Sequence, residues 1–460
     1  MQAHPNTALS YPLSYFSDSA RLMTTLATLE MPVFFDSSSH ADGSARYDLL
    51  SAAPTAYLKI ERGQPSCSDP DIEIDSLNLF KAIRKLQQKY LPLSELAEDI
   101  GHAQPLGMGG GIMGYLGYPR LRGKDDLEIQ DAFVGVYHWA VIVDHHAQTT
   151  ALVLHGACPE ALKCKLLDLL LDGSPVDAGP YPDDFMLRSN FIKQLSRERY
   201  TQAFKRIKGY IDAGDCYQVN LTQQFKAECS GSPLAAYLKL RRSSPAPFSA
   251  YLNWGSGALL SLSPERFLKV VGNSVITQPI KGTRPRDVNR NKDAQLAREL
   301  LSSEKDRAEN LMIVDLLRND LGQVCRTGSI KADQLFELQS FSNVHHMVST
   351  ISGELAAQKD ALDLLESCFP GGSITGAPKL RAMEIIQELE PLPRQAYCGA
   401  VFYLGANGDM DSNITIRSLL WQPGSLLCGA GGAIVADSDC DAEYEECFHK
   451  ISSIINSLKR

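Results

Sequence analysis

The chain has 460 residues, of which 44% are hydrophobic and 22% charged, and its formal net charge is −9. This length can bury a sizeable core, and either about three average domains or one large α+β unit would fit within it. The acidic balance gives no general attraction to nucleic acid or to anionic membranes, so any anion site must be local. We therefore expect a globular protein that binds neither nucleic acid nor membrane.

The cysteine spacing and the N-terminal sequence indicate the cellular compartment in which the protein is expected. Eleven cysteines are scattered without a C-x-x-C pair or a zinc-finger spacing, which favours a reducing environment over a disulfide scaffold. Residues 1–16 lack a basic segment followed by an apolar one, and no apolar run approaches the roughly 18 residues that cross a bilayer. A cytoplasmic location is expected.

The segment 172–190, DGSPVDAGPYPDDFMLRSN, concentrates Gly, Pro, Asp and Ser, which is typical of a connecting segment. It separates an N-terminal region, 1–171, from a C-terminal region, 191–460. Strand-like runs at 133–144 and 149–156 are joined by a short polar turn, and this pattern predicts a hairpin.

Helical spacing of apolar residues begins after that segment. In residues 196–214 the apolar residues recur at helical spacing between Ser196, which can cap the start of a helix, and Gly214, which can end one. The same spacing occurs in 302–320 and 441–460. Strands are predicted between these helices by runs at 215–225, 249–254, 258–270 and 274–280.

Two ionisable residues, Glu265 and Lys281, fall at predicted strand ends or turns, where rigid scaffolds commonly present functional groups. The lysine lies in ITQPIKGTRPR, 276–286, a string that in isolation is usually a solvated basic loop. Glu446 and Lys450 are four residues apart in a predicted helix, and an ordinary salt bridge would explain that pair.

Glycine and hydroxyl residues precede a predicted helix start in 369–386, where free backbone N–H groups could bind a carboxylate. This segment is one of eight motifs that follow one order along the chain: SLSPERF, PIKGTRPR, DRAENLMIVDLLRND, VHHMVST, FPGGSITGAPKLRAMEII, YCGAVFYL, NITIRS and IVADSDCDAEYEECFHK. In order and spacing they resemble the chorismate-utilising enzymes, which include anthranilate synthase component I, isochorismate and salicylate synthases, and aminodeoxychorismate synthase component I. The match runs from about residue 190 to the C-terminus, and ARYD (45–48) and VYHWA (136–140) extend it more weakly into the N-terminal region.

The resemblance implies an α+β fold of two large, mostly antiparallel β-sheets packed as a sandwich with helices on the outside. Within the family, P-I-K-G-T together with GDCYQVNL is similar to aminodeoxychorismate synthase component I, whereas anthranilate synthases usually have P-I-A-G-T. The lysine of this P-I-K-G-T string is Lys281, and the resemblance implies that its amine acts as a nucleophile. It then needs a pKa lowered by burial or by a neighbouring cation such as Arg284.

The implied reaction, in para-aminobenzoate and folate biosynthesis, is a transaminase-type amination of chorismate. Lys281 attacks C2 of the ring, Glu265 protonates the leaving C4 hydroxyl, and ammonia enters at C4 and expels the lysine. Glu265 would need a raised pKa to be protonated at neutral pH. His346 matches a family histidine near the leaving hydroxyl, with a hydrogen-bonded core histidine as an equal alternative.

The resemblance also implies a Mg²⁺ cofactor held by Glu309 and Glu446, in place of the salt bridge. The positions that match substrate-binding residues are Gly282, Thr283, Tyr397, Arg417, the Gly431-Gly432-Ala433 turn and Lys450. Many members have glycine where Ala433 stands, and an alanine with φ > 0 in that turn would cost about 1 kcal/mol.

Ammonia must come from elsewhere, because the chain has no G-x-C-x-G nucleophile motif of a class I glutamine amidotransferase. We expect a heterodimer with a separate amidotransferase subunit. A tryptophan pocket is implied by residues in both regions: Ser37, Ser44, Ala45, Arg46, Tyr47, Pro247, Phe248 and Ser249. The feedback motif L-L-E-S of anthranilate synthases is replaced by LLSA, 49–52, which speaks against feedback inhibition.

Two alternatives stay open. An anthranilate synthase component I is disfavoured by Lys281 and by LLSA. A non-catalytic amino-acid-binding subunit that kept the fold would be expected to have lost Glu265, Glu309 or Glu446, and all three are present.

Overall fold

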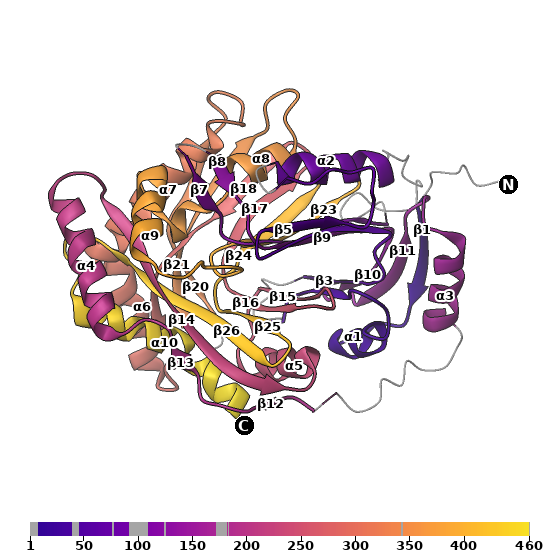
Figure 1. Ribbon diagram of the computed structural model, residues 1–460, viewed down its shortest axis with the longest axis horizontal. Coiled ribbons are helices and arrows are strands. Elements are labelled where there is room, and N and C mark those ends of the chain that lie inside the picture. The colour runs from indigo at the N-terminus through magenta and orange to yellow at the C-terminus, as the bar shows by residue number, and fades with distance from the viewer. Residues whose placement is uncertain are drawn as a thin grey trace.

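The computed structural model describes residues 8–38, 46–75, 78–91, 109–123, 126–171, 182, 184–341 and 344–459. Two large antiparallel sheets form the centre of the molecule, and helices lie around them (Figure 1). The helices in the described residues are α1 (Ala20–Leu26), α2 (Leu79–Tyr90), α3 (Glu160–Leu171), α4 (Arg197–Asp212), α5 (Pro233–Ser243), α6 (Arg290–Ser302), α7 (Glu304–Leu321), α8 (Ala361–Cys368), the 3₁₀ turn η2 (Gly372–Ile374), α9 (Lys379–Leu389) and α10 (Cys440–Lys459).

The first sheet has 13 strands within the described residues. In spatial order its main path is β1 (Leu9–Leu13), β11 (Thr149–Leu154), β10 (Trp139–Asp144), β3 (Tyr47–Ser51), β2 (Val33–Asp36), β15 (Phe248–Asn253), β16 (Ala258–Ser263), β25 (Ser418–Gln422), β26 (Ser425–Ile434), β14 (Gln218–Ser230) and β12 (Met186–Leu187). The short strands β13 (Ile192–Lys193) and β22 (Gly376–Ala377) also pair with β14.

The second sheet has 11 strands in the same described part of the chain. Its main path is β19 (Ile280–Pro285), β21 (Val344–Glu354), β18 (Ser274–Gln278), β17 (Arg266–Val271), β24 (Met410–Ile414), β23 (Ala400–Gly405), β6 (Gly111–Leu116), β9 (Ala132–Tyr137), β4 (Ala56–Glu61) and β5 (Gln64–Cys67), with β20 (Lys331–Ser340) paired to β21. A separate small hairpin joins β7 (Arg120–Arg122) to β8 (Asp126–Glu128).

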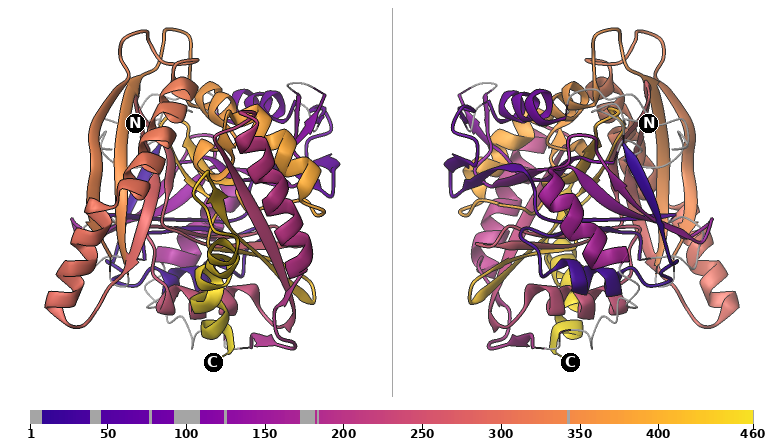
Figure 2. Two further views of the ribbon diagram at one scale, coloured as in Figure 1. Left: turned by 90° about the vertical axis from the view of Figure 1, so that its left-hand side faces the viewer. Right: turned by 90° about the vertical axis from the view of Figure 1, so that its right-hand side faces the viewer.

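The two sheets pack face to face. One buried apolar cluster contains Leu49 and Ile142 from the first sheet together with Met113 and Phe133 from the second. Helices cover the outside, where α10 lies along β26 and α7 lies against β19 and β21 (Figure 2). The expected sandwich of two antiparallel sheets is confirmed. The sheets pack together because apolar residues on their inner faces bury each other.

Both sheets run through the N-terminal and the C-terminal regions. In the first sheet β2 pairs with β15, with Asp36 opposite Ser249, and in the second β6 pairs with β23. Strands from 1–171 and from 191–460 are therefore hydrogen-bonded to each other in each sheet.

Two apolar runs that look continuous in the sequence cross from one sheet to the other. The run 133–144 ends strand β9 at Tyr137 and begins β10 at Trp139, and these strands belong to different sheets. The run 258–270 ends β16 at Ser263 and begins β17 in the other sheet. Glu265 lies at this second crossing, between the sheets. The predicted hairpin of β10 and β11 is confirmed.

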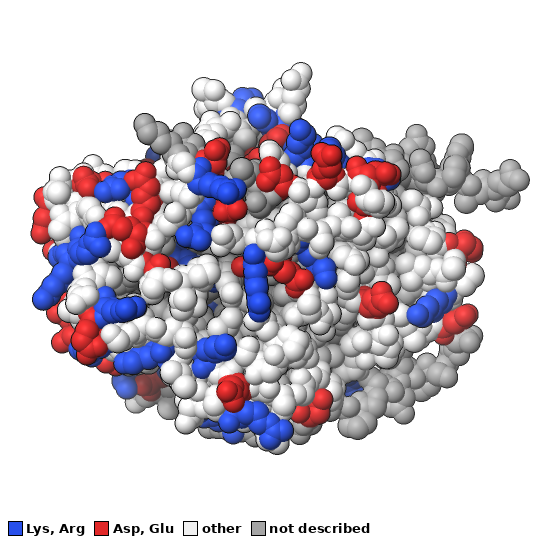
Figure 3. Space-filling view, in the orientation of Figure 1, with Lys and Arg blue, Asp and Glu red and all other residues white. Residues whose placement is uncertain are grey.

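The predicted helices are also confirmed. The Ser196 side chain caps α4 by accepting a hydrogen bond from the backbone N–H of Arg199, and Gly214 follows the helix with φ +79°. The described part of the chain contains no helix that is both long and apolar enough to cross a membrane. On the face drawn in Figure 3, basic and acidic side chains are interspersed.

Candidate active site

Lys281 lies in a bulge of the second sheet. The register between β19 and β21 shifts between Ile280 and Thr283, so Lys281 and Gly282 are not part of the regular ladder. Bulges next to functional sites re-aim a side chain away from the usual alternation. Gly282 has φ +82°, and a Cβ there would come within 2.7 Å of Leu300 Cδ1, so glycine is required by both conformation and space.

Glu265 is 5% exposed, at the turn between β16 and β17. The Ser373 hydroxyl donates a hydrogen bond to its Oε1 at 2.7 Å, and the backbone of Ile280 also bonds to the carboxyl group. Burial raises the pKa of Glu265 to about 7, because a charged carboxylate is poorly solvated there. A large fraction of Glu265 is therefore protonated at neutral pH, as the expected general acid requires.

Burial lowers the pKa of the Lys281 amine, and the Lys450 ammonium lowers it further while the Glu309 carboxylate opposes the shift. The expected direction of this shift is confirmed. Arg284, the example of a neighbouring cation taken from the sequence, forms an ion pair with Asp306 at 3.0 Å and is not among the main causes of the shift. The nearby cation that acts on Lys281 is instead Lys450, which is distant in the sequence.

The two expected metal ligands come from different helices, Glu309 from α7 and Glu446 from α10. Burial raises the pKa of Glu309. The pKa of Glu446 is lowered although burial opposes this, because the Lys450 ammonium binds Glu446 Oε1 at 2.6 Å. Both carboxylates act on the charge of Lys281, so the structure gathers them around one site. The salt bridge of Glu446 with Lys450 is present.

A third carboxylate, Glu443, lies one helical turn before Glu446 and is 5% exposed. Ser438 donates a hydrogen bond to its Oε1 at 2.8 Å, while its Oε2 has no hydrogen-bond partner in the described part of the chain. A Cβ on Gly432 would lie 2.6 Å from Glu443 Oε2 and 3.6 Å from Glu446 Oε2. In the sequence Glu443 shared a helix face with Glu446, but nothing there distinguished it from a solvated residue.

These carboxylates are chemically suited to Mg²⁺. Among the described residues, no three or more His, Cys, Asp or Glu side chains are grouped closely enough to form a complete metal cage. Magnesium is usually held by one or two carboxylates, with waters and substrate oxygens completing its shell. Burial raises the pKa of Glu309 although Lys281 and Lys305 oppose this, and Glu443 Oε2 has no hydrogen-bond partner in the described part of the chain.

Two of the residues expected to bind substrate, Gly431 and Arg417, form hydrogen bonds with Lys450. Its ammonium donates a hydrogen bond to the Gly431 carbonyl at 2.8 Å, and the Arg417 guanidinium donates one to the Lys450 carbonyl. The segment Gly431-Gly432-Ala433 is part of strand β26, with Ala433 opposite Asn220, so the expectation of a turn is wrong. Ala433 is not among the residues with positive φ, and the expected conformational cost does not arise.

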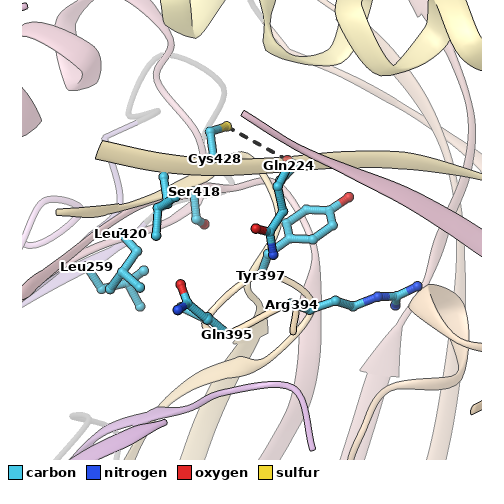
Figure 4. A pocket seen from close by; sticks show the side chains of 11 residues that line it. Gln224, Leu259, Arg394, Gln395, Tyr397, Ser418, Leu420 and Cys428 are labelled. Atoms are coloured by element: carbon cyan, nitrogen blue, oxygen red, sulfur yellow. Dashed lines mark hydrogen bonds between the residues drawn. The ribbon is translucent and has the colours of Figure 1, made fainter. Parts of the chain in front are cut away.

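Tyr397 is held against the backbone of β26. A Cβ on Gly429 would lie 2.2 Å from Tyr397 Cγ, so the ring packs directly on the glycine. Figure 4 shows Tyr397 beside Gln224 and Cys428 at a small cavity of about 20 Å³. Burial raises the pKa of Tyr397 well above its ordinary value, which keeps the phenol available as a hydrogen-bond donor.

His346 pairs across the sheet with Thr283, whose hydroxyl lies 2.9 Å from its Nδ1. Burial lowers the pKa of His346 to about 4, so the imidazole is neutral at pH 7. With Arg417 it lines a cavity of about 80 Å³. The structure thus places a hydrogen-bonded, buried histidine next to the Gly282-Thr283 bulge, where it can position the bulge or bond to a substrate oxygen.

Comparison with known proteins shows the family to which the chain belongs. Residues 38–456 match the family described as chorismate binding enzyme. Aminodeoxychorismate synthase component 1 of Escherichia coli K12 is 45% identical over 78% of this chain and 79% of its own length, and that of Klebsiella aerogenes is 45% identical over 90% of each. The chain belongs to the chorismate binding enzyme family.

A solved member of this family has the same fold. Anthranilate synthase component I from Streptococcus pneumoniae TIGR4 superposes with a TM-score of 0.74 at 29% identity, covering 89% of this chain and 92% of that one. The match spans most of the chain, so strands of the N-terminal region also belong to the shared fold.

A third cavity, of about 440 Å³, lies away from Lys281. Six of the residues expected to bind tryptophan line it: Ser37, Arg46, Tyr47, Pro247, Phe248 and Ser249. Ser44 and Ala45 lie outside the described residues. Burial raises the pKa of Asp36, at the same cavity, to about 6, although Arg241 opposes this. Tryptophan binding stays a prediction.

Proposed function

We propose that this chain converts chorismate and ammonia to 4-amino-4-deoxychorismate. The observation that carries the proposal is the placement of Lys281, a bulged lysine with a lowered pKa, beside Glu265, whose pKa is raised to about 7. Oppositely shifted acid and base groups in one site are typical of catalytic pairs. The two relatives named above carry the name of this activity.

The first step uses both residues. The neutral Lys281 amine attacks C2 of chorismate, the two ring double bonds shift, and the C4–O bond breaks while Glu265 gives its proton to the leaving oxygen, which departs as water. Ammonia then attacks C4, the double bonds shift back, and the bond between C2 and the lysine nitrogen breaks. The net change is the replacement of the C4 hydroxyl by an amino group with release of one water.

Chorismate carries two carboxylates, and we propose that Arg417, Tyr397 and Lys450 bind them. Arg417 is already oriented by its bond to the Lys450 carbonyl, and Lys450 by its bond to Gly431. Groups held in place before the substrate arrives lose little entropy on binding. The Lys450 ammonium also lowers the pKa of the Lys281 amine, because a second positive charge nearby is unfavourable.

For the cofactor, we propose that Glu309 and Glu446 hold Mg²⁺, with Glu443 next to them. When bound, the ion would neutralise a substrate carboxylate and the repulsion among these glutamates. The unpaired oxygen of Glu443 and the raised pKa of Glu309 support this assignment.

The ammonia source is proposed to be a separate glutamine amidotransferase subunit in a heterodimer. The sequence lacks an amidotransferase nucleophile motif, and the relatives are named as a component 1. The purified chain should then use ammonium salts but not glutamine, and gain glutamine-dependent turnover when the partner subunit is added. Glutamine-dependent synthesis by the purified chain alone would contradict this.

The direct test is mass spectrometry and chromatography of the product formed from chorismate, ammonium and Mg²⁺. The proposal predicts 4-amino-4-deoxychorismate. Anthranilate as the product would favour an anthranilate synthase, and binding of chorismate without turnover would favour a non-catalytic subunit.

A further inference from the structure

Three successive backbone carbonyl groups anchor η2, the turn whose Ser373 hydroxyl binds the proposed acid. The Asn220 side-chain amide donates a hydrogen bond to the Ser373 carbonyl at 3.2 Å, and the Asn220 backbone N–H donates one to the Thr375 carbonyl at 2.8 Å. Between them, the Arg394 guanidinium donates one to the Ile374 carbonyl at 3.0 Å. These bonds fix the backbone from which the serine hydroxyl extends.

Arg394 joins η2 to two further elements. Its Nη2 donates hydrogen bonds to the Asn220 carbonyl of β14 at 2.8 Å and to Glu390 Oε1 at 2.7 Å, and its Nε donates one to Glu390 Oε2 at 2.8 Å. Glu390 Oε1 in turn accepts hydrogen bonds from the backbone N–H and the hydroxyl of Thr222, both at 2.9 Å. Since Glu390 directly follows α9, one guanidinium ties together η2, β14 and the end of α9.

The ion pair of Arg394 with Glu390 is buried, with side chains that are 2% and 7% exposed. Removing two charges from water is costly, and apolar residues of similar volume often stabilise a fold as well as a buried ion pair does. In Figure 4 the Arg394 side chain extends away from Gln395 and Leu259, so its guanidinium is directed at its protein partners rather than into the small cavity. Stability alone therefore does not account for an arginine here, whereas a planar fork that holds a carboxylate and two carbonyls at once does.

We propose that Arg394 is a positioning residue for proton transfer from Glu265 and acts through the Ser373 hydroxyl. The inference rests on the proposed function, in which Glu265 gives its proton to the leaving oxygen. Arg394 fixes the carbonyl of Ile374, the residue after Ser373, and also the carbonyl of Asn220, whose side chain holds the Ser373 carbonyl. The hydroxyl is thereby kept 2.7 Å from Glu265 Oε1. Because Oε1 accepts this bond, the acidic proton is directed to the other oxygen, Oε2.

Other charged groups act on Glu265 from different elements. Lys281 and the backbone of β19 lower its pKa, and so does Lys450 of α10. The carboxylate of Glu265 also contributes to the raised pKa of the Cys398 thiol. Arg394 is not among the main causes of the shift at Glu265, so it acts by holding η2 rather than as a neighbouring charge. All these other groups stay in place when Arg394 is replaced.

Arg394→Lys tests the role, because it keeps a positive charge beside Glu390 but replaces the fork with a single ammonium that cannot hold both carbonyls. In steady-state kinetics with chorismate, ammonium and Mg²⁺, kcat should fall roughly 10-fold, with KM for chorismate within about twofold of the parent. The descending limb of kcat/KM should move by roughly 0.5 pH unit toward higher pH, because a bond that favours the charged form of Glu265 is weakened.

The double variant Ser373→Ala/Arg394→Lys separates positioning from a general loss of structure. If Arg394 acts through Ser373, the limb of the double variant should coincide with that of Ser373→Ala alone. Arg241→Lys is the matched control, since Arg241 is a largely buried arginine of α5 that pairs with Asp36 at 2.6 Å. It should lower the melting temperature without moving the limb.

An Arg394→Lys limb that coincides with the parent's would refute the positioning role, as would a double variant whose limb moves further than that of Ser373→Ala. If Arg394→Lys does not fold, Asn220→Ala decides in the same assay, because it removes the amide through which the same anchor reaches the Ser373 carbonyl. Its limb should also move to higher pH, and an unmoved limb would refute the anchoring. A parent that forms no amino product would instead overturn the proposed function.

Discussion

The pKa of Glu265 is set mainly by burial and is opposed by the hydrogen bond from Ser373. Burial raises its pKa, whereas the Ser373 hydroxyl stabilises the carboxylate and lowers it. Because the proton donor is the protonated form, the limb of the pH profile that Glu265 controls should fall as the pH rises through its pKa of about 7, whereas protonation of the Lys281 amine lowers the rate on the acid side.

Removing that hydrogen bond should move this pH dependence. Ser373→Ala leaves burial in place and removes a contact that favours the charged form, so the pKa of Glu265 should rise. A net hydrogen bond of about 0.5–1.5 kcal/mol corresponds to a move of the descending limb of kcat/KM by roughly 0.5 to 1 pH unit toward higher pH. A limb that stays in place, or moves to lower pH, would show that Glu265 is not the group that titrates.

The sequence predicted the properties that follow from residue type and motif. It did not predict the neighbours of each side chain, which depend on contacts in the folded chain. The sequence indicated that Lys281 needs a lowered pKa and that Glu265 needs a raised one. It suggested Arg284 as the neighbouring cation because that residue is close in the chain, but Arg284 binds Asp306 and the cation is Lys450. Glu443 was missed because its burial against Gly432 is set by the packing of α10 on β26.

Glycines in strand β26 allow Tyr397 and Glu443 to pack directly against its backbone. Gly429→Ala would put a Cβ 2.2 Å from Tyr397 Cγ, and neither the ring nor the strand can move freely. Overpacking of this kind typically costs about 1–3 kcal/mol. Urea unfolding should show this loss together with a raised KM for chorismate. A Gly429→Ala variant as stable and active as the parent would contradict the packing of Tyr397 described above.

Gly209→Ala is the matched control. This glycine lies inside α4, has no atom within 4 Å of a Cβ built on it, and does not have a positive φ. The same substitution there should stabilise the protein by about 0.5–1 kcal/mol, because alanine loses less backbone entropy in a helix.

The periodicity of apolar residues predicted which segments form helices or strands and roughly where they lie. It did not predict the two places where the chain crosses from one sheet to the other. The helices α4, α7 and α10 follow the apolar spacing of the sequence, and Ser196 caps α4 as expected. The run that forms β9 and β10 shows no change of pattern where the chain crosses between sheets, because both strands are buried throughout. The run that forms β16 and β17 passes from a fully buried strand to a partly exposed one, but its apolar residues continue across the crossing. That crossing is decided by tertiary packing.

At the scale of the whole molecule, the proposed metal site joins α7 to α10, which are far apart in the chain. Glu309→Gln and Glu446→Gln should each lower kcat/KM by about 100-fold or more and weaken Mg²⁺ binding measured by calorimetry. The double variant should lose little beyond the worse single variant, because one shared ion is lost in each case.

Glu445→Gln is the control for that experiment, since Glu445 neighbours Glu446 on α10 but pairs with Arg197 at 3.7 Å. It should leave Mg²⁺ binding unchanged. Additive losses for the two glutamates, or unchanged Mg²⁺ binding in Glu446→Gln, would contradict a shared ion.

The overall architecture was predictable through the motifs and their order, which indicated two antiparallel sheets and are matched by the solved relative. Individual strands alone would not have shown it, because the partners of β2 and β6 lie more than 200 residues away in β15 and β23. Pairing over such distances depends on the complete fold.

The most direct test of the account is the mass of the protein after reaction with chorismate and Mg²⁺ in the absence of ammonia. If Lys281 is the nucleophile, a fraction of the chain should be heavier by chorismate less one water, with the added mass on the peptide that contains Lys281, and Lys281→Ala should show none. Lys281→Arg keeps the positive charge but not the nucleophile, so it should be inactive. An unmodified parent together with a Lys281→Arg variant that still forms the 4-amino product would contradict the covalent step and leave the lysine an electrostatic role.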